Sequence, residues 1–442
     1  MAIIAQKELF CWSDIEELGD LERLMLVFES LPDEALMRRL EAQRGSRGRD
    51  DYPVRPVWNS LLASIVFQHP SIEALRRELS RNGQLRLICG FPAVDGERAV
   101  PTASVYTRFL AKLFEDEHNA RELRDIFDTL VQRCSEVLSG FGERLGGDGK
   151  PISSFARRQG TRPADRRGEH DADWGRHEHH HSDAEGTTST TVKRWFGFTL
   201  HLLADTAYEL PVNFAVTPAS YNEMPVMHEL IDDSACRYPG IVERAQMFTG
   251  DRGLDDGKLV EKLWEYYRIK PVIDIRNLWK DGEESKRVPG TENVVYDYKG
   301  TVSCVCPESE TERVMAYGGF EANRGTLKYR CPASHYGVEC AGAAQCPLKD
   351  AIRIPLSVDR RVFTPVARSS YRWSELYRER TAVERINGRI DRSFGFELHT
   401  TRGLEKMRMR VTVACAVMLA MALGRAQRNE HRLVRSLVRR SA

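Results

Sequence analysis

The sequence predicts an α/β protein that begins with a helical region and carries a β-rich insertion. From about residue 140 to 276, segments rich in β-branched and aromatic residues alternate with segments of helical periodicity, which is typical of an α/β sheet. Over the first 130 residues or so, apolar residues recur at helical spacing. Between Asn277 and Arg368, short strand-like pieces, turns and five of the ten cysteines replace the alternation, so we expect an insertion there.

These changes of pattern divide the chain into five units. They are a helical region at 1–135, the first part of the α/β domain at 140–276, the β-rich insertion at 277–368, the second part of the α/β domain at 369–428 and a basic tail at 429–442. A length of 442 residues suits about two to four domains.

The helical region has two recognisable helix starts. Ser71 and Thr102 are suited to cap helices, and apolar residues follow each of them at helical spacing. Short helices joined by tight turns fit a helix-turn-helix DNA reader. They fit any small helical bundle equally well, and the pattern does not separate the two.

The elements of the α/β domain can be placed along the chain. Strands are expected in GERLGGDGKPISSFA, where the strand closes in a glycine-rich turn, and in KRWFGFTLHLLADT, ELPVNFAVTPA, AQMFTGDRG and KPVIDIR. Helices are expected in MPVMHELIDDSA, KLVEKLWEYYRI and YRWSELYRERTAVERINGRIDRSF. Residues 157–190 are polar and rich in Arg and His, so they predict a long loop. The apolar run 411–424 is shorter than the ~20 residues of a membrane span and predicts a buried core helix.

Charge distribution and cysteine content limit which partners and which cellular compartment we expect. The formal net charge of +1 neither favours nor excludes a nucleic-acid partner, but ten Lys or Arg stand against two Glu from Thr401 onward, and seven against two Asp over residues 144–167. Such segments are either faces for an anionic partner or solvated helix faces. MAIIAQKELF has no basic stretch followed by an apolar core, so we expect no signal peptide, a cytoplasmic location and reduced thiols.

Three acidic residues carry the candidate chemistry. Asp148 lies in GGDGK and Asp251 in FTGDRG, each after a predicted strand, and Glu384 lies on a predicted helix. Taken singly, each has a plain alternative, since an Asp between glycines is usually a turn residue and a helical Glu usually faces solvent. Carboxylates converging from separate elements can instead hold two divalent metals about 3.5–4 Å apart, which is suited to phosphodiester chemistry. Their hard oxygen ligands favour Mg²⁺ or Mn²⁺.

The helix around Glu384 adds a phenol and a guanidinium. At about 100° per residue, Tyr377, Arg380 and Glu384 fall within about 60° of arc on one face. An ordinary exposed face can show the same three groups. Arg380 and Tyr377 are also the groups that would clamp a DNA phosphate beside a metal-bound Glu384.

These motifs resemble the DDE transposases of bacterial insertion sequences, in the branch whose glutamate helix reads Tyr-x2-Arg-x3-Glu-x6-Lys. Tyr377, Arg380 and Glu384 match, whereas Asp391 stands where the family has Lys. The order Asp, Asp, Glu also matches, as do the DG and DRG motifs and the helical sequence before them. The resemblance covers roughly residues 50–425. It implies an RNase H-like mixed sheet with flanking helices, in which the β-rich insertion precedes the glutamate helix.

The resemblance also implies an activity. A transposase of this kind cleaves DNA at the ends of its element and transfers the freed 3′ hydroxyl into target DNA. Asp148, Asp251 and Glu384 would hold two Mg²⁺ or Mn²⁺ ions per active site. Double-stranded DNA, as terminal inverted repeats and as target, is the implied partner of a homodimer, and no membrane is involved. The alternatives are an RNase H-like nuclease without strand transfer and a domesticated DNA-binding protein without catalysis; the presence of all three acids argues against the latter.

Four further residues concern DNA contact. We expect the helical region to recognise the DNA end, and Arg392 to supply the phosphate contact that the family's Lys would make, because its long side chain can swing back toward that face. Asp391 is then expected to point aside and pair with a neighbouring Arg. Trp279 is a candidate for stacking on an unpaired base, whereas Trp195, flanked by strand residues, is better explained as core.

Two clusters of metal-binding residue types have plainer explanations. His170, His177 and the run His179 to His181 can bind a transition metal, but adjacent histidines do not easily converge on one ion, so a polar loop is favoured. Cys331, Cys340 and Cys346, with Cys304 and Cys306 upstream, can form a structural Zn²⁺ site. Their spacing lacks the short Cys-x2-Cys pair, and reduced, partly buried thiols are the favoured alternative.

Overall fold

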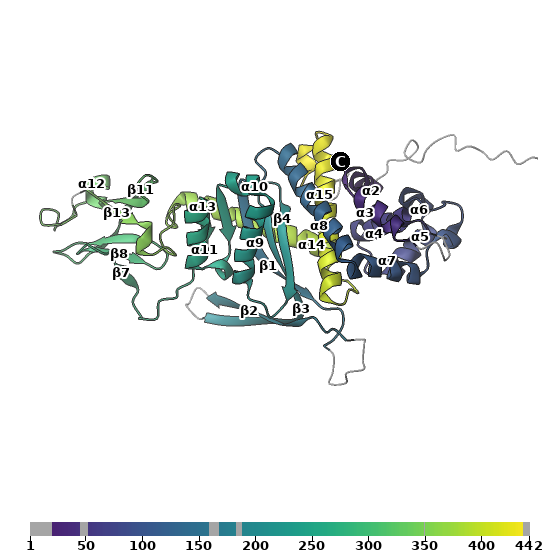
Figure 1. Ribbon diagram of the computed structural model, residues 1–442. Helices are drawn as coiled ribbons and strands as arrows, with labels where there is room; N and C mark the ends of the chain where they lie inside the picture. The colour runs from purple at the N-terminus through teal and green to yellow at the C-terminus, as the bar shows by residue number, and fades with distance from the viewer. Residues whose placement is uncertain (1–19, 45–51, 159–167, 183–187, 349, 436–442) are drawn as a thin grey trace, which may run out of the picture.

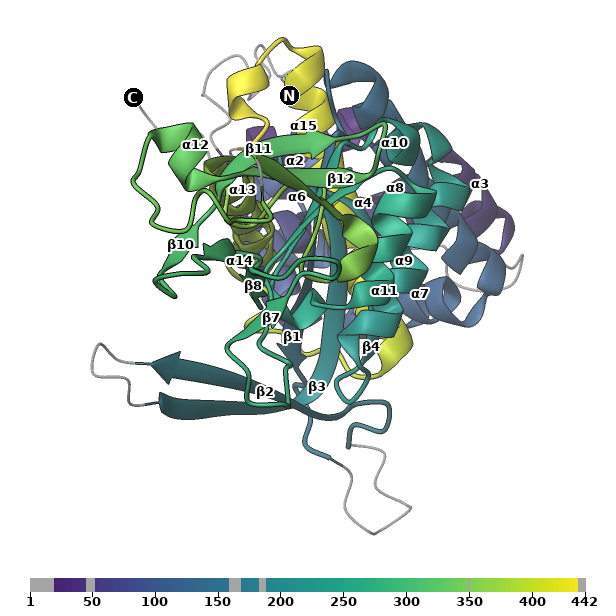
Figure 2. The same cartoon turned by 90° about the vertical axis from the view of Figure 1, so that its left-hand side faces the viewer.

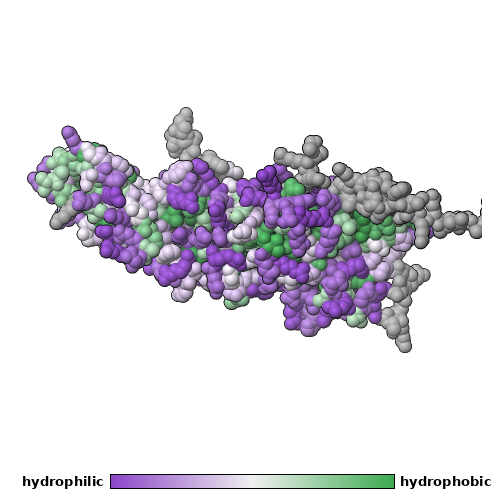
Figure 3. Space-filling model, turned by 90° about the horizontal axis from the view of Figure 1, so that it is seen from above, coloured by the Kyte–Doolittle hydropathy of each residue, from purple (hydrophilic) through white to green (hydrophobic). Residues whose placement is uncertain are grey.

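The protein extends along one axis, with its helical region, central sheet and β-rich insertion in a row (Figure 1). The structure, a computed structural model, describes residues 20–44, 52–158, 168–182, 188–348 and 350–435. In the view from above, hydrophilic residues cover most of the visible face and hydrophobic residues form scattered patches (Figure 3).

The central sheet has six strands. They are β1 (Arg144–Ser153), β2 (Asp173–Ser182), β3 (Thr188–Asp205), β4 (Leu210–Pro218), β5 (Met247–Gly250) and β6 (Lys270–Ile273). β3 pairs antiparallel with β1, β2 and β4, whereas β1, β5 and β6 pair in parallel. An antiparallel meander continued by parallel strands on the far side of β1 is the strand arrangement of an RNase H-like sheet. The predicted fold class is confirmed.

Helices accompany the sheet in the chain segments where the sequence predicted helices. α9 (Glu223–Arg237) and the short α10 (Pro239–Arg244) connect β4 to β5, and α11 (Gly257–Glu261) continues as one π-helical turn, η3 (Lys262–Tyr266), before β6. α13 (Tyr371–Tyr377), the 3₁₀ turn η5 (Arg378–Arg380) and α14 (Thr381–Ser393) occupy the stretch predicted as a single helix. The predicted single helix is therefore interrupted by a 3₁₀ turn between Tyr377 and Thr381.

The helical region contains seven helices in the described part of the chain. They are α2 (Leu21–Ser30), α3 (Glu34–Ala42), α4 (Val54–Val66), α5 (Ile72–Arg81), α6 (Gly83–Cys89), α7 (Ala103–Glu115) and α8 (Glu117–Val137). Ser71 caps α5 as predicted, since its hydroxyl accepts from the Ala74 N–H at 3.2 Å. Thr102 precedes α7 but its hydroxyl hydrogen-bonds Ser104 instead of capping the helix, so that expectation was wrong.

α15 (Leu404–Gln427) joins the helical region to the sheet (Figure 1). It is long and apolar enough to cross a membrane, but 78% of its apolar window is buried inside the protein. Cys134 of α8 lies 3.8 Å from the Leu419 carbonyl, and the buried Arg425 pairs with Glu22 of α2 at 3.1 Å. The prediction of a buried core helix over 411–424 is confirmed.

The β-rich segment between β6 and α13 has its own core. One sheet contains β7 (Ser285–Arg287), β8 (Val294–Asp297), β9 (Val302–Val305) and β10 (Glu312–Val314), and the other contains β11 (Ala316–Glu321), β12 (Thr326–Arg330) and β13 (Ala351–Pro355), with the short helix α12 (Pro332–Tyr336) between β12 and β13. Apolar side chains from both sheets and the following loop, including Val294, Tyr329 and Phe363, form a cluster separate from the main core.

The expected loop at 157–190 was largely wrong, because β2 and β3 form a long antiparallel hairpin from Asp173↔Gly197 to Ser182↔Thr188. Figure 2 shows this hairpin projecting from the body of the protein. Its sequence is polar on both faces, so it lacks the apolar alternation that marks a half-buried strand. The histidine run 179–181 therefore lies on a strand; residues 159–167 and 183–187 lie outside the described residues.

Candidate active site

Asp148 and Asp251 are brought level by adjacent parallel strands. β1 pairs with β5 with Gly146 opposite Thr249, and the same register continued by two residues sets Asp148 beside Asp251. Asp251 is the first residue after β5, and its carboxylate accepts from the Gly253 N–H at 2.7 Å. Its predicted position at a strand end is confirmed, and the sheet supplies the rigid support that a metal site needs.

Asp148 itself lies in the middle of β1, so the predicted glycine-rich turn was wrong. The strand continues from Arg144 to Ser153 through the glycines. They are needed because neighbours approach closely: a Cβ on Gly147 would lie 2.7 Å from the Phe248 ring and 2.8 Å from Met227. Gly in a strand often marks such a close approach as well as a turn, and the sequence does not distinguish the two.

α14 lies along β1 in a regular register. Val383 packs where a Cβ on Gly146 would come within 2.8 Å, and the Asn387 amide donates to Asp148 Oδ2 at 2.8 Å. Asp391 is paired with Lys150 at 2.5 Å. Four helical residues rise about 6 Å and two strand residues about 6.6–6.8 Å, so these successive contacts stay in step. This register holds the glutamate helix against the strand that carries Asp148.

The Glu384 side chain is exposed and already paired. Arg380 donates to Glu384 Oε1 at 2.7 Å, and the Arg380 guanidinium carbon lies 5.6 Å from the centre of the Tyr377 ring. That ring stacks on Trp373 at 4.7 Å. The three groups that the sequence placed on one face are therefore in contact, although the helix is divided between them.

Negative charge is concentrated at this site. Burial, followed by the charge of Asp251, raises the pKa of Asp148 to about 7, and Arg380 only partly offsets this. Burial raises the pKa of Glu223, at the start of α9, to about 8, with Asp251 and Asp148 as the next causes. A cation in the site would relieve both shifts.

Carboxylate oxygens are suitable ligands for Mg²⁺ or Mn²⁺, but the carboxylates of this site do not all point toward one position. In the part of the chain that the structure describes, no three His, Cys, Asp or Glu side chains are arranged to hold a metal ion as they stand. Glu384 is turned toward Arg380 and Asp148 toward Asn387. Glu223 Oε1, by contrast, is a buried atom without a hydrogen-bond partner. The donor set and this unpartnered oxygen fit a hard divalent cation.

The comparison with known families decides what this arrangement belongs to. The family model described as the transposase DDE domain matches residues 165–420, more than half of the chain. The chain belongs to this family. The matched residues include Asp251 and Glu384, and Asp148 precedes them.

Other comparisons add little to the family match. Among curated proteins, no relative matches the chain. The chain is similar to a solved structure described as a piggyBac transposase synaptic complex with hairpin DNA, at 13% identity over 96% of this chain and 86% of that one, with a TM-score of 0.31. This likeness is too distant to bear on the fold or the activity.

The outcome at Asp391 corrects one expectation for this DDE-family chain. Asp391 does turn aside into an ion pair, but its partner is Lys150 on β1 and not a neighbouring Arg. Lys150 follows Asp148 by two residues, so strand alternation directs both side chains to the same face. Arg392 is exposed, without an ion pair to another described residue, and remains a candidate for DNA contact.

The two tryptophans lie in different surroundings. Trp279 is half-buried in the β-rich insertion, with the Tyr296 ring 5.9 Å away and the Lys286 ammonium 4.6 Å from its ring. Its stacking on a DNA base stays a prediction. Trp195 donates from its indole to the Phe198 carbonyl at 3.1 Å and is packed over Gly175, as suits a structural residue.

The five cysteines of the insertion line one cavity of about 320 Å³. The Cys340 and Cys306 sulfurs are 3.8 Å apart, and burial followed by the nearby Cys331, Cys346 and Cys340 raises the pKa of Cys304 to about 11. Within the described residues they do not meet in a set of three metal ligands. The Zn²⁺ site that the sequence offered as the less favoured alternative at Cys331, Cys340 and Cys346 is therefore not supported.

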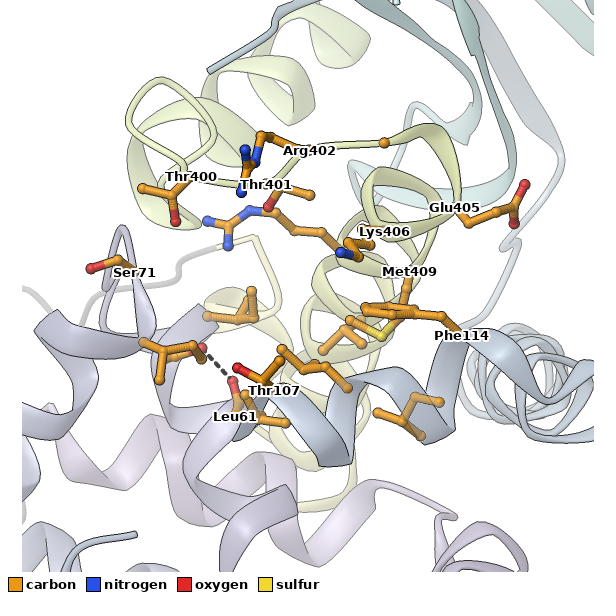
Figure 4. A pocket seen from close by; sticks show the side chains of 18 of the residues that line it. Leu61, Ser71, Thr107, Phe114, Thr400, Thr401, Arg402, Glu405, Lys406 and Met409 are labelled. Carbon is orange, nitrogen blue, oxygen red and sulfur yellow. Dashed lines mark hydrogen bonds between the residues drawn. The ribbon is translucent and has the colours of Figure 1, made fainter. Parts of the chain in front are cut away.

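A cavity of about 740 Å³ lies away from the carboxylates, between the helical region and the start of α15 (Figure 4). Leu61 and Phe114 line one side, and Arg402, Lys406 and Met409 line the other. It contains none of the three DDE acids, so it is not the candidate active site.

Three residues at the site were missed in the sequence. Asn387 and Lys150 carry no motif of their own, and their contacts appear only once α14 is packed on β1. Glu223 had one usable signal, an acidic residue directly after a probable helix cap, Asn222, in the short connection that follows a strand. That pattern is also ordinary helix capping.

Gly146 gives a test of the helix–strand contact. A Cβ at this position would lie 2.8 Å from Val383, 2.9 Å from Thr206 and 2.9 Å from Thr249. We expect Gly146→Ala to destabilise the protein by about 1–3 kcal/mol, as overpacking does, and to lower DNA cleavage further by displacing α14. Gly240→Ala is the control, since a Cβ there meets nothing within 4 Å. Equal urea-denaturation midpoints for the two variants would contradict the tight packing.

Proposed function

We propose that the protein is a DNA transposase that cleaves the ends of its element and joins the freed 3′ hydroxyl to target DNA. The observation that carries this is the placement of Asp148 level with Asp251, with the Glu384 helix held against β1 through Asn387. The family match supports the same reaction class.

Asp148, Asp251 and Glu384 would hold two Mg²⁺ or Mn²⁺ ions, in keeping with their oxygen donors. When bound, such ions activate the attacking oxygen and stabilise the leaving oxygen of a phosphodiester. Asn387 fixes Asp148 by donating to Oδ2. Arg380, which donates to Glu384 in this structure, would transfer to a DNA phosphate and orient the DNA beside Tyr377.

The two steps exchange bonds at phosphorus. In cleavage, a water oxygen bonds to phosphorus while the bond to the 3′ oxygen breaks, which leaves a 3′ hydroxyl and a 5′ phosphate. In joining, the 3′ hydroxyl oxygen bonds to a target phosphorus and displaces the target's own 3′ oxygen, so the number of phosphodiester bonds is unchanged. The released protons pass to water.

The wider setting is also proposed. The partners would be terminal inverted repeats and target DNA, bound by a homodimer in the cytoplasm, with the helical region recognising the DNA end. Because α15 packs against α2 and α8, the helical region shares its core with the rest of the chain, and recognition is best tested in the full-length protein.

The deciding experiment uses the purified full chain with labelled duplexes of the repeats that flank its gene, a supercoiled target plasmid and Mg²⁺. We expect 3′ ends at the repeat boundary and repeat DNA joined to the plasmid. Cleavage without joined product would favour a nuclease of the same fold. Binding without cleavage would favour a domesticated DNA-binding protein, and random-duplex cleavage equal to repeat cleavage would contradict end recognition.

Arg392 tests the proposed phosphate contact. Its exposed cation has no described ion-pair partner, so we expect Arg392→Ala to weaken binding to all duplexes and to reduce the slope of log affinity against log salt by about 0.9. Arg133→Ala, which removes an exposed cation on α8, is the control. An unchanged salt slope for Arg392→Ala would place the contact elsewhere.

A further inference from the structure

Glu223 lies beside residues that follow the two aspartates of the candidate site, Gly149 after Asp148 and Gly253 after Asp251. A Cβ on Gly149, the residue after Asp148, would lie 2.8 Å from the Glu223 carboxyl group. A Cβ on Gly253, two residues after Asp251, would lie 2.8 Å from Asp251 Oδ1 and 3.2 Å from Glu223 Oε2. The Glu223 carboxylate therefore lies between β1 at Gly149 and the turn that follows Asp251.

The packing of α9 on β1 places Glu223 there. The Asn222 side chain accepts from the Met224 N–H at 3.1 Å, which starts the helix at Glu223. Met227 is one helical turn further along the same face, and it packs where a Cβ on Gly147 would lie. Glu223 against Gly149 and Met227 against Gly147 follow the same step along helix and strand, so the position of Glu223 is fixed by the core.

Glu223 has no cation of its own among the described residues. The Gly149 N–H donates a hydrogen bond to the Glu223 carboxylate, but Oε1 is buried without a hydrogen-bond partner, and no described Lys or Arg forms an ion pair with the carboxylate. Glu384, in contrast, is exposed and engaged by Arg380. A buried carboxylate oxygen without a hydrogen-bond partner is costly, and such atoms occur where a metal or a proton completes the site.

We propose that Glu223 is a fourth carboxylate of the metal site, contacting a divalent cation together with Asp148 and Asp251 from the buried side, while Glu384 and Arg380 face the DNA. This inference rests on the proposed function. It assigns a metal ligand outside the three acids that the motif supplies, and it gives α9 a direct part in the active site.

The test measures Mn²⁺ binding without DNA, by calorimetry and by the paramagnetic signal of free Mn²⁺. We expect Glu223→Gln to weaken Mn²⁺ affinity at least ten-fold and Asp148→Asn to do the same, with cleavage lost in parallel. Glu223→Asp keeps the charge but shortens the side chain, and we expect an intermediate affinity. Glu229→Gln, on an exposed position of the same helix, is the control and should bind Mn²⁺ as the wild type does.

The outcomes separate the inference from the proposed function. If Glu223→Gln binds Mn²⁺ and cleaves like the wild type while Asp148→Asn loses both, Glu223 is not a ligand and the transposase proposal stands. If Asp148→Asn and Asp251→Asn also bind Mn²⁺ normally, the metal site itself is wrong. Near-native melting curves for each variant ensure that the losses are local.

Discussion

Asp148→Asn is expected to abolish DNA cleavage, by more than about 10³-fold, while the protein still folds and binds DNA. The carboxylate is lost but its shape and the hydrogen bond to Asn387 can be kept. Asp251→Asn and Glu384→Gln should have effects of the same size, and double variants should add little, because residues that act as one unit lose function together. The measurement is single-turnover cleavage of repeat duplex in Mg²⁺ and in Mn²⁺.

The same variant makes a thermodynamic prediction. In the metal-free protein, the pKa of Asp148 is raised from 3.8 to about 7, so the folded state binds the proton more tightly than the unfolded state. The stability contributed by Asp148 is therefore largest below its unfolded pKa and falls as pH rises toward 7. Asp148→Asn should melt at the same or a higher temperature than the wild type at pH 8 and respond less to Mg²⁺.

Asp125→Asn serves as the control for both measurements, since Asp125 is exposed on α8 and forms no described ion pair. It should leave cleavage and melting unchanged. Wild-type cleavage rates in any one of the three active-site variants would remove that residue from the proposed unit.

The sequence predicted the sheet well because its strands have strong local patterns. β4 to β6 and α9 were found by apolar content and periodicity, and Asp251 by its position after β5. β1 was found but its course was misjudged, since glycine that permits close packing and glycine that permits a turn look alike. The β2–β3 hairpin was missed because its sequence is polar at alternate positions of both kinds and so lacks the apolar alternation of a half-buried strand.

Only part of the candidate site could be predicted from the sequence, because local patterns group residues that are close in the chain and not residues that meet through packing. Tyr377, Arg380 and Glu384 are close in sequence, so helical geometry was enough to group them. Glu223 and Lys150 reach the site through packing between elements far apart in the chain, and no local pattern reports such contacts. The family pattern exposed the anomaly at Asp391 without showing its partner.

The Lys150–Asp391 pair is expected to fix the glutamate helix to β1. The Lys150 side chain is 8% exposed and that of Asp391 27%, and their 2.5 Å contact is the last step of the register that runs through Val383 and Asn387. Breaking a largely buried pair leaves one charge unpaired, which costs about 3–5 kcal/mol. Asp391→Ala, which leaves the Lys150 ammonium without its partner, should therefore lower stability and cleavage strongly.

Reversing the pair tests whether geometry or charge sign matters. Asp391→Lys alone sets two ammonium groups against each other and should be the most damaging single change, although it restores the residue of the family pattern. Adding Lys150→Asp re-forms the ion pair in the opposite sense, so the double variant should recover most of the lost stability in urea denaturation. If Asp391→Lys alone is as stable and active as the wild type, position 391 accepts either charge, and α14 is held by Val383 and Asn387 without the ion pair.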